Sequence, residues 1–233
     1  MVYASWRHAL VTLGIAATPF IFLLFFARFT NVTLHILLSD LFVSSVRLLA
    51  AYVISVILAW IAGALLYRGR RAIIALPAAD VLQSFPTFAA LPLAAYVWGA
   101  GNATVIFFLV VTIIWPIFFS IVSSLKLIRH DWDEAVRIAG LGGWAYVRYF
   151  LLPVSLPGVI TGSIIGLGEG WEALVATEII LGSRVGLGSF FSGYSGNSAI
   201  TSLGILGLLL FIFSLNSIVW LPLLHRSHAR IEE

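Results

Sequence analysis

Six long apolar runs, separated by short polar breaks, dominate the pattern of this chain. About twenty apolar residues are enough for a helix to cross the ~30 Å hydrocarbon core of a bilayer. Backbone polar groups in that core need internal hydrogen bonds, so continuous apolar runs predict helices, whereas a barrel would require alternation. We therefore predict an all-α membrane protein with six transmembrane helices. The predicted spans are residues 9–27, 42–66, 73–98, 102–124, 156–181 and 202–224.

The first run needs separate treatment, because Arg7 and His8 precede it as in a signal peptide. No small-residue cleavage site follows, since residues 25–29 are bulky, and we predict a retained helix. Residues 1–41 are thus predicted as an N-terminal helix with an external loop. We predict residues 42–225 as the core of the protein and residues 226–233 as a tail.

Basic residues are distributed unevenly between the two sides of the predicted membrane. With the N-terminus in the cytoplasm, ten Lys and Arg residues fall inside, and only Arg28 and Arg184 fall clearly outside. Lys and Arg favour the cytoplasmic side, so both termini are predicted to be cytoplasmic. The pI of about 9.5 then reports membrane topology and not a nucleic-acid partner. With no cysteine in the chain, disulfides, thiol catalysis and thiolate metal sites are excluded.

One charged segment, residues 129–153, lies between the fourth and fifth spans, on the predicted cytoplasmic side. Asp131 is placed to cap a short helix, with Glu134 three residues on as in a capping box. Gly140 can adopt positive φ and end that helix. We expect a second helix to resume after the glycines and to stop at Pro153.

Five residues of this segment carry a resemblance to a known family: Glu134, Ala135, Gly140, Leu152 and Pro153. Their spacing resembles the EAA loop of ABC importer permeases, which reads E-A-A, three residues, G, nine residues and I-x-L-P. Val136 replaces the second alanine and Phe150 the isoleucine. An amphipathic helix lying at the membrane interface is the alternative. The match at fixed spacing favours the EAA loop.

The resemblance extends over roughly 180 residues from Phe42. Residues 76–99 are similar to permeases of the nitrate/sulfonate/taurine group, which carry a proline-rich third helix. Gln83 and Asp80 depart from that group, in which arginine and proline are common at these positions. These departures weaken any inference about the substrate.

The resemblance implies the type I ABC importer permease fold and a set of partners. These are a second permease copy, two ATP-binding cassette subunits, an external or periplasmic substrate-binding protein and the lipid bilayer of a bacterial or archaeal cytoplasmic membrane. The chain would import a small solute, with a lean toward a nitrate/sulfonate/taurine-type anion, by alternating access. The ATPase subunits would grip residues 131–150. The implied coupling residues are Asp131, Glu134, Ala135, Ala139, Gly140, Leu141 and Pro153.

We predict no catalysis by the chain itself, because it has no G-x-x-x-x-G-K-[ST] loop around its only lysine, Lys126. ATP and Mg would be bound by the partner ATPase, and no cofactor by this chain. The five histidines do not cluster in a span, so no metal site is predicted.

Polar residues inside membrane spans usually face a cavity or a partner. On this basis we predict path-lining candidates and structural candidates in spans two, three and five. Two path glutamates would repel an anion unless they were paired or protonated. The path candidates are Gln83, Ser84, Phe85, Thr87, Glu169, Trp171 and Glu172. The structural candidates are Arg47, Pro86 and Glu178, with Glu178 expected to bond Arg47 or Gln83.

Two rival functions come from other classes. Residues 193–196 resemble the G-x-S-G of rhomboid intramembrane proteases, with Ser195 as the nucleophile. The candidate bases His225 and His228 are about thirty residues away, which at 1.5 Å per helical residue is roughly a membrane thickness. A nucleophile needs its base within hydrogen-bond reach, so the spacing argues against a protease. A passive channel or secondary transporter is the other rival, and would not need the cytoplasmic loop.

Overall fold

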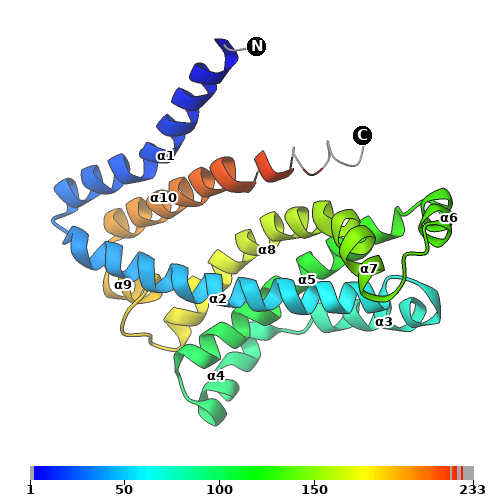
Figure 1. Cartoon of the computed structure of the whole chain (residues 1–233). Helices are drawn as coiled ribbons and strands as arrows, with labels where there is room; N and C mark the ends of the chain where they lie inside the picture. The colour runs from blue at the N-terminus through cyan, green and yellow to red at the C-terminus, as the bar shows by residue number, and fades with distance from the viewer. Residues whose placement is uncertain (1–2, 221, 225–226, 228–233) are drawn as a thin grey trace.

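The computed structural model describes residues 3–220, 222–224 and 227, and every regular element in that part of the chain is helical (Figure 1). The elements in chain order are α1 (Tyr3–Thr30), α2 (Leu34–Leu66), α3 (Gly69–Gln83), α4 (Thr87–Trp98), α5 (Asn102–Lys126), α6 (His130–Ile138), α7 (Gly143–Tyr146), the π-helical turn η1 (Val147–Leu151), α8 (Leu152–Ile180), α9 (Leu187–Gly193), α10 (Ser198–Leu215) and the π-helical turn η2 (Asn216–Trp220). His225, Arg226, His228 and Arg230 lie outside the described residues.

The predicted all-α membrane architecture is confirmed. Five stretches of the described residues are long and apolar enough to cross a membrane on their own. The pair α3 and α4 adds a sixth span if it is counted as one broken helix. The short helices α6 and α7 project together from one end of the bundle, and α9 lies at the opposite end (Figure 1). We call these the loop end and the far end.

The predicted external loop before residue 42 is wrong for most of its length. Helix α2 begins at Leu34, so only residues 31–33 separate it from α1. The Asp40 carboxylate, inside the predicted loop, is buried and accepts a hydrogen bond from the Gly186 amide at 2.8 Å. A charged residue in the first turns of α2 thus satisfies a backbone donor near α9 and does not face water.

The third predicted span is broken and not continuous. Helices α3 and α4 meet at an angle of 79° across residues 84–86. Pro86 has no amide to donate and disfavours α-helical geometry at Phe85, which accounts for the break at this point. Non-helical backbone at membrane depth is tolerated where it is buried in protein or lines a cavity.

Helices α2, α5 and α8 form the core, and α1 packs against α10 beside it (Figure 1). The contact between α5 and α8 is close because α8 turns glycines toward α5. A Cβ added at Gly158 would lie 2.5 Å from the Ser120 carbonyl oxygen, and one added at Gly162 would lie 2.5 Å from the Ile117 Cα. Small residues let membrane helices approach closely and pack without a hydrophobic driving force. This stripe recurs every four residues, at Gly158, Gly162, Gly166 and Gly170.

Candidate functional site

Helix α6 carries two different faces. Trp132, Asp133 and Val136 are half-buried on the side that faces the bundle. Glu134, Ala135, Ile138 and Ala139 form an exposed surface beside it, and Ile138 is 87% exposed. The outward face therefore presents small and apolar residues at helical spacing, with no cover from this chain.

The C-terminal end of α6 is built as predicted around Gly140. Its φ is +66°, and the Gly140 amide bonds the Arg137 carbonyl at 3.1 Å. The Leu141 amide reaches back to the Val136 carbonyl at 3.1 Å, which completes a Schellman motif. Leu141 is half-buried and closes the helix end, so it is less available to a partner than Ala139.

The predicted capping box at the start of α6 is wrong. The helix begins at His130, one residue before Asp131, and no side chain caps its first amides. Asp131 instead pairs with Arg129 at 2.7 Å, and Glu134 lies 3.2 Å from His130. Asp131 still lies in the first turn, where the helix dipole favours negative charge.

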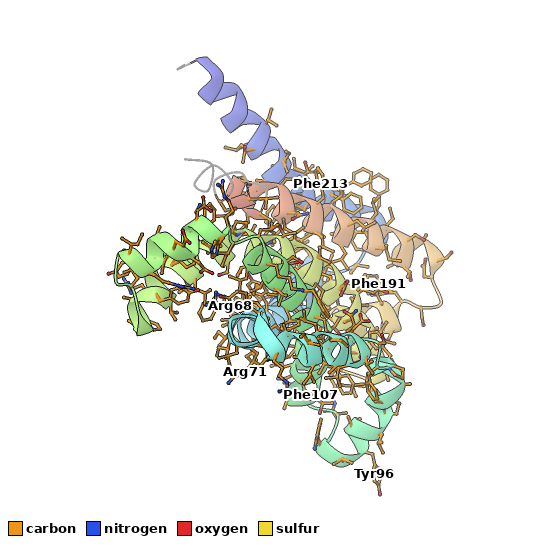
Figure 2. The ribbon with its side chains drawn as sticks, turned by 90° about the vertical axis from the view of Figure 1, so that its right-hand side faces the viewer. Arg68, Arg71, Tyr96, Phe107, Phe191 and Phe213 are labelled. Carbon is orange, nitrogen blue, oxygen red and sulfur yellow. The ribbon has the colours of Figure 1, made fainter. Side chains whose placement is uncertain are left out.

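Two polar contacts tie the loop end together. Arg68, in the turn between α2 and α3, pairs with Asp133 of α6 at 3.1 Å. The Tyr67 and Tyr146 hydroxyls lie 3.2 Å apart and link the end of α2 to α7. Burial raises the pKa of Tyr67, and the bond to Tyr146 raises it further. Figure 2, viewed from this end, shows Arg68 beside the projecting α6 segment.

Pro153 does not stop the second helix, contrary to the prediction. The helical path runs from Gly143 through η1 into α8 without a break. Pro153 sits at the start of α8, directly after the π-helical turn. We attribute the tolerance to that wider turn, because it changes the i→i−4 bonding that a proline would otherwise interrupt. α7, η1 and α8 thus form one continuous helical path from the loop end into the core.

A groove of about 830 Å³ opens between the α3–α4 break, α5 and α8. It brings together four of the seven predicted path residues, Gln83, Phe85, Thr87 and Glu169, with Pro86 beside them. Ser84 lies at the break, but its hydroxyl bonds the Asp80 carbonyl at 3.0 Å and it does not line the groove. The other lining residues are Phe88, Ala89, Val111, Thr112, Trp115, Pro116, Phe119, Ser120 and Ile165.

The polar and aromatic candidates of span five do not share one surface. Trp171 and Glu172 border a second, mostly apolar groove of about 760 Å³ between α8 and α10. Trp171 is only 5% exposed and packs edge-on against Phe211, with ring centroids 5.7 Å apart. Glu169 instead lines the groove beside the α3–α4 break, so the predicted path candidates of span five border two different grooves.

At the far end, Arg47 and Glu178 are in contact, with Arg47 Nη1 2.6 Å from Glu178 Oε1. Ser44 Oγ donates to the Glu178 carboxylate at 2.9 Å, and the Gly188 amide donates to its Oε2 at 2.9 Å. Arg47 also donates to the Val185 carbonyl at 2.9 Å. Glu178 is fully buried. These bonds join α2, α8 and the segment leading into α9.

Three members of this cluster were missed in the sequence: Asp40, Ser44 and Asn102. Ser44 accepts from the Leu187 amide at 2.9 Å, and Asn102 accepts from Arg47 Nε at 3.0 Å. Asp40 and Ser44 are four residues apart on α2, a spacing that places them on one helix face with Arg47. That spacing was the available signal, but reading residues 30–41 as a loop concealed it.

The structure gives the protease alternative no support in the described residues. The Ser195 hydroxyl donates to the Ser192 carbonyl at 2.9 Å, within its own turn. The candidate bases His225 and His228 lie outside the described residues.

Comparison with known proteins gives an independent finding. Residues 51–221 match the sequence family described as the binding-protein-dependent transport system inner membrane component. That range includes α5 through α10, the loop end and both grooves.

Three relatives illustrate the similarity. A nitrate import permease protein of Synechocystis sp. is 33% identical over 152 residues, 61% of this chain and 55% of that protein. A bicarbonate transport system permease protein of Synechococcus elongatus is 28% identical over 141 residues, 58% and 51% of the two chains. A taurine transport system permease protein of Escherichia coli is 32% identical over 112 residues, 48% and 40% of the two chains. The matched segments thus span about half the length of these relatives.

Proposed function

Because the chain belongs to the family of binding-protein-dependent transport system inner membrane components, we propose that it is the permease subunit of an ATP-driven importer of a small polar solute. The observation that carries the proposal is the outward face of α6. It projects from the bundle, presents Ala135, Ile138 and Ala139, and ends at the positive-φ Gly140. A projecting helix with small and apolar residues suits insertion into a groove of a partner.

In this proposal two ATP-binding subunits, one for each of two permease copies, bind the α6 faces. ATP and Mg are held by those subunits, and this chain binds neither. Movement of α6 reaches the membrane helices by two routes. One is the continuous helical path from α7 into α8, and the other is the Arg68–Asp133 and Tyr67–Tyr146 contacts with the end of α2. Alternating access follows when these helices shift around the groove.

The remaining partners and the location follow from the same proposal. An external substrate-binding protein delivers solute at the far end of a homodimer or a pair of similar permeases. The complex resides in a bacterial or archaeal cytoplasmic membrane, with the loop end and both termini on the cytoplasmic side. The three relatives are named as permeases for nitrate, bicarbonate and taurine, which supports an anionic group on the solute.

The test is co-expression with the ATP-binding subunit encoded beside the chain, followed by purification in detergent. We expect a stable complex with the wild type and at least a tenfold loss of bound ATPase for Ala135→Asp and Gly140→Asp. Arg71→Asp is the control, because Arg71 is exposed at the loop end but lies outside the α6 face (Figure 2). All three variants should elute as the wild-type permease does when they are purified alone.

The same experiment discriminates the rival functions. A wild-type chain that never retains an ATPase would overturn the importer proposal and favour a passive channel or a secondary transporter. If all three variants retained equal amounts of ATPase, the surface that binds the ATPase would not be on α6.

A further inference from the structure

The lining of the groove between the α3–α4 break, α5 and α8 carries negative but no positive charge in the described residues. Glu169 is the only charged side chain that lines it, and no Lys, Arg or His borders it within the described residues. Its remaining polar lining is neutral and comes from Gln83 and from the hydroxyls of Thr87, Thr112 and Ser120. A bare anion entering this groove would meet negative charge without a compensating cation.

Glu169 lies deep in the predicted membrane. It is eleven residues from the end of α8 at Ile180, which at 1.5 Å per residue is about 16 Å, or half of a ~30 Å core. In the part of the chain that the structure describes, Glu169 makes no ion pair or hydrogen bond. Glu178 on the same helix has Arg47, Ser44 and Gly188 as partners. An ionised carboxylate at this depth is costly unless water or a cation reaches it.

Aromatic rings line the same groove from two sides. Phe85 and Phe88 come from the helix break and α4, and Trp115 and Phe119 come from α5. The faces of aromatic rings attract cations, most strongly where water is excluded. A carboxylate together with aromatic faces is a combination that suits an ammonium or another organic cation.

We propose that this groove is a cation-selective part of the solute path, with Glu169 as its specificity-determining residue. The transported solute then carries a positively charged group, and an ion with negative charge alone is disfavoured at this point. A negative group elsewhere on the same solute is tolerated, because α4 begins at Thr87 beside the groove and a helix N-terminus favours negative charge. The substrate class rests on the proposed importer function, whereas the charge selectivity of the groove does not.

The absence of cysteine makes a direct test available. Thr112→Cys places the only thiol of the chain in the groove. The full chain in nanodiscs, with or without its ATPase, is treated with the cationic trimethylammonium-ethyl and the anionic sulfonatoethyl methanethiosulfonates. The ratio of the two labelling rates cancels thiol ionisation and any steric limit on access that both reagents share. It is measured in the Thr112→Cys chain alone and after adding Glu169→Gln or Glu172→Gln.

We expect the cationic reagent to react faster, and Glu169→Gln to lower the ratio about tenfold, the lower end of the range for charge steering in clefts. Glu172→Gln is the matched control, because it removes the same charge from the same helix but borders the other groove. Glu172→Gln should change the labelling ratio by no more than about twofold. A ratio unaffected by Glu169→Gln, or lowered equally by both variants, would overturn the proposal. If no ATPase complex formed but the labelling ratio was as expected, the importer proposal would fail. The proposed cation selectivity of the groove would still stand.

Discussion

Individual buried charges in this protein are stable only where neighbouring groups replace water, and the Arg47–Glu178 pair is the clearest case. Glu178 is fully buried and Arg47 nearly so, and each has further hydrogen-bond partners. Removing one member of such a pair leaves the other buried without compensation, at a cost of about 3–5 kcal/mol. The paired residues therefore act on stability as a unit.

We predict that Arg47→Met lowers the thermal unfolding midpoint of the detergent-solubilised protein by several degrees, as followed by tryptophan fluorescence. The double variant Arg47→Met/Glu178→Met should lose less than Arg47→Met alone, since no charge is left unpaired. Arg184→Met removes the same charge from an exposed site at the far end and should change the midpoint little. Equal losses for Arg47→Met and Arg184→Met would contradict the role assigned to the pair.

Single residues also show what the sequence could predict. Glu178 was expected to bond Arg47 or Gln83, because a charge in a membrane span needs a partner, and it bonds Arg47. Trp171 was predicted as a path residue, but an indole satisfies a core position between α8 and α10 as well as a path position. Composition alone could not separate these two environments.

At the scale of helices, the close contact of α5 and α8 depends on the glycine stripe of α8. Gly162 faces the α5 backbone, where a Cβ would lie 2.5 Å from the Ile117 Cα and 2.9 Å from the Pro116 carbonyl oxygen. Backbone atoms cannot rotate away as a side-chain end can, so the helices would have to separate. Overpacking of this kind typically costs 1–3 kcal/mol or more.

We predict that Gly162→Ala reduces the yield of monodisperse protein severalfold in fluorescence-detected gel filtration and lowers its thermal midpoint. Gly168→Ala is the matched control, because it lies on the same helix with no atom within 4 Å of its added methyl group. If both variants behaved alike, helix propensity and not helix contact would explain the effect.

Helix ends proved harder to predict than helix existence. The apolar runs located the membrane helices, and Gly140 marked the end of α6 because only a positive φ allows the chain to turn there. The predictions for the start of α6, the start of α2 and the passage through Pro153 were wrong. Asp131 pairs with Arg129 and does not cap α6, Asp40 bonds the distant Gly186 amide, and Pro153 follows a π turn. Local propensity predicts none of these.

At the scale of the whole molecule, all-helical membrane architecture follows from hydropathy, but the arrangement of the grooves does not. Gln83 and Thr87 were recognised as polar residues in an apolar span, with the helix breaker Pro86 between them. The 79° bend between α3 and α4 places them beside α5 and α8, and the size and direction of that bend cannot be read from the local sequence. The orientation of the bundle in the membrane rests on the distribution of basic residues, and it supports a test of its own.

We predict that the loop end faces the cytoplasm. Ala139 at the loop end and Ser195 at the far end are both exposed. Because the chain has no cysteine, a single cysteine introduced at either position labels that end alone. A membrane-impermeant maleimide should label Ser195→Cys in spheroplasts and Ala139→Cys only in inverted vesicles, because Lys and Arg near spans are retained inside. The unmodified chain measures background labelling. The reverse pattern would place α6 outside the cell, where no ATP-driven subunit could bind it, and the proposed coupling would fail together with the orientation.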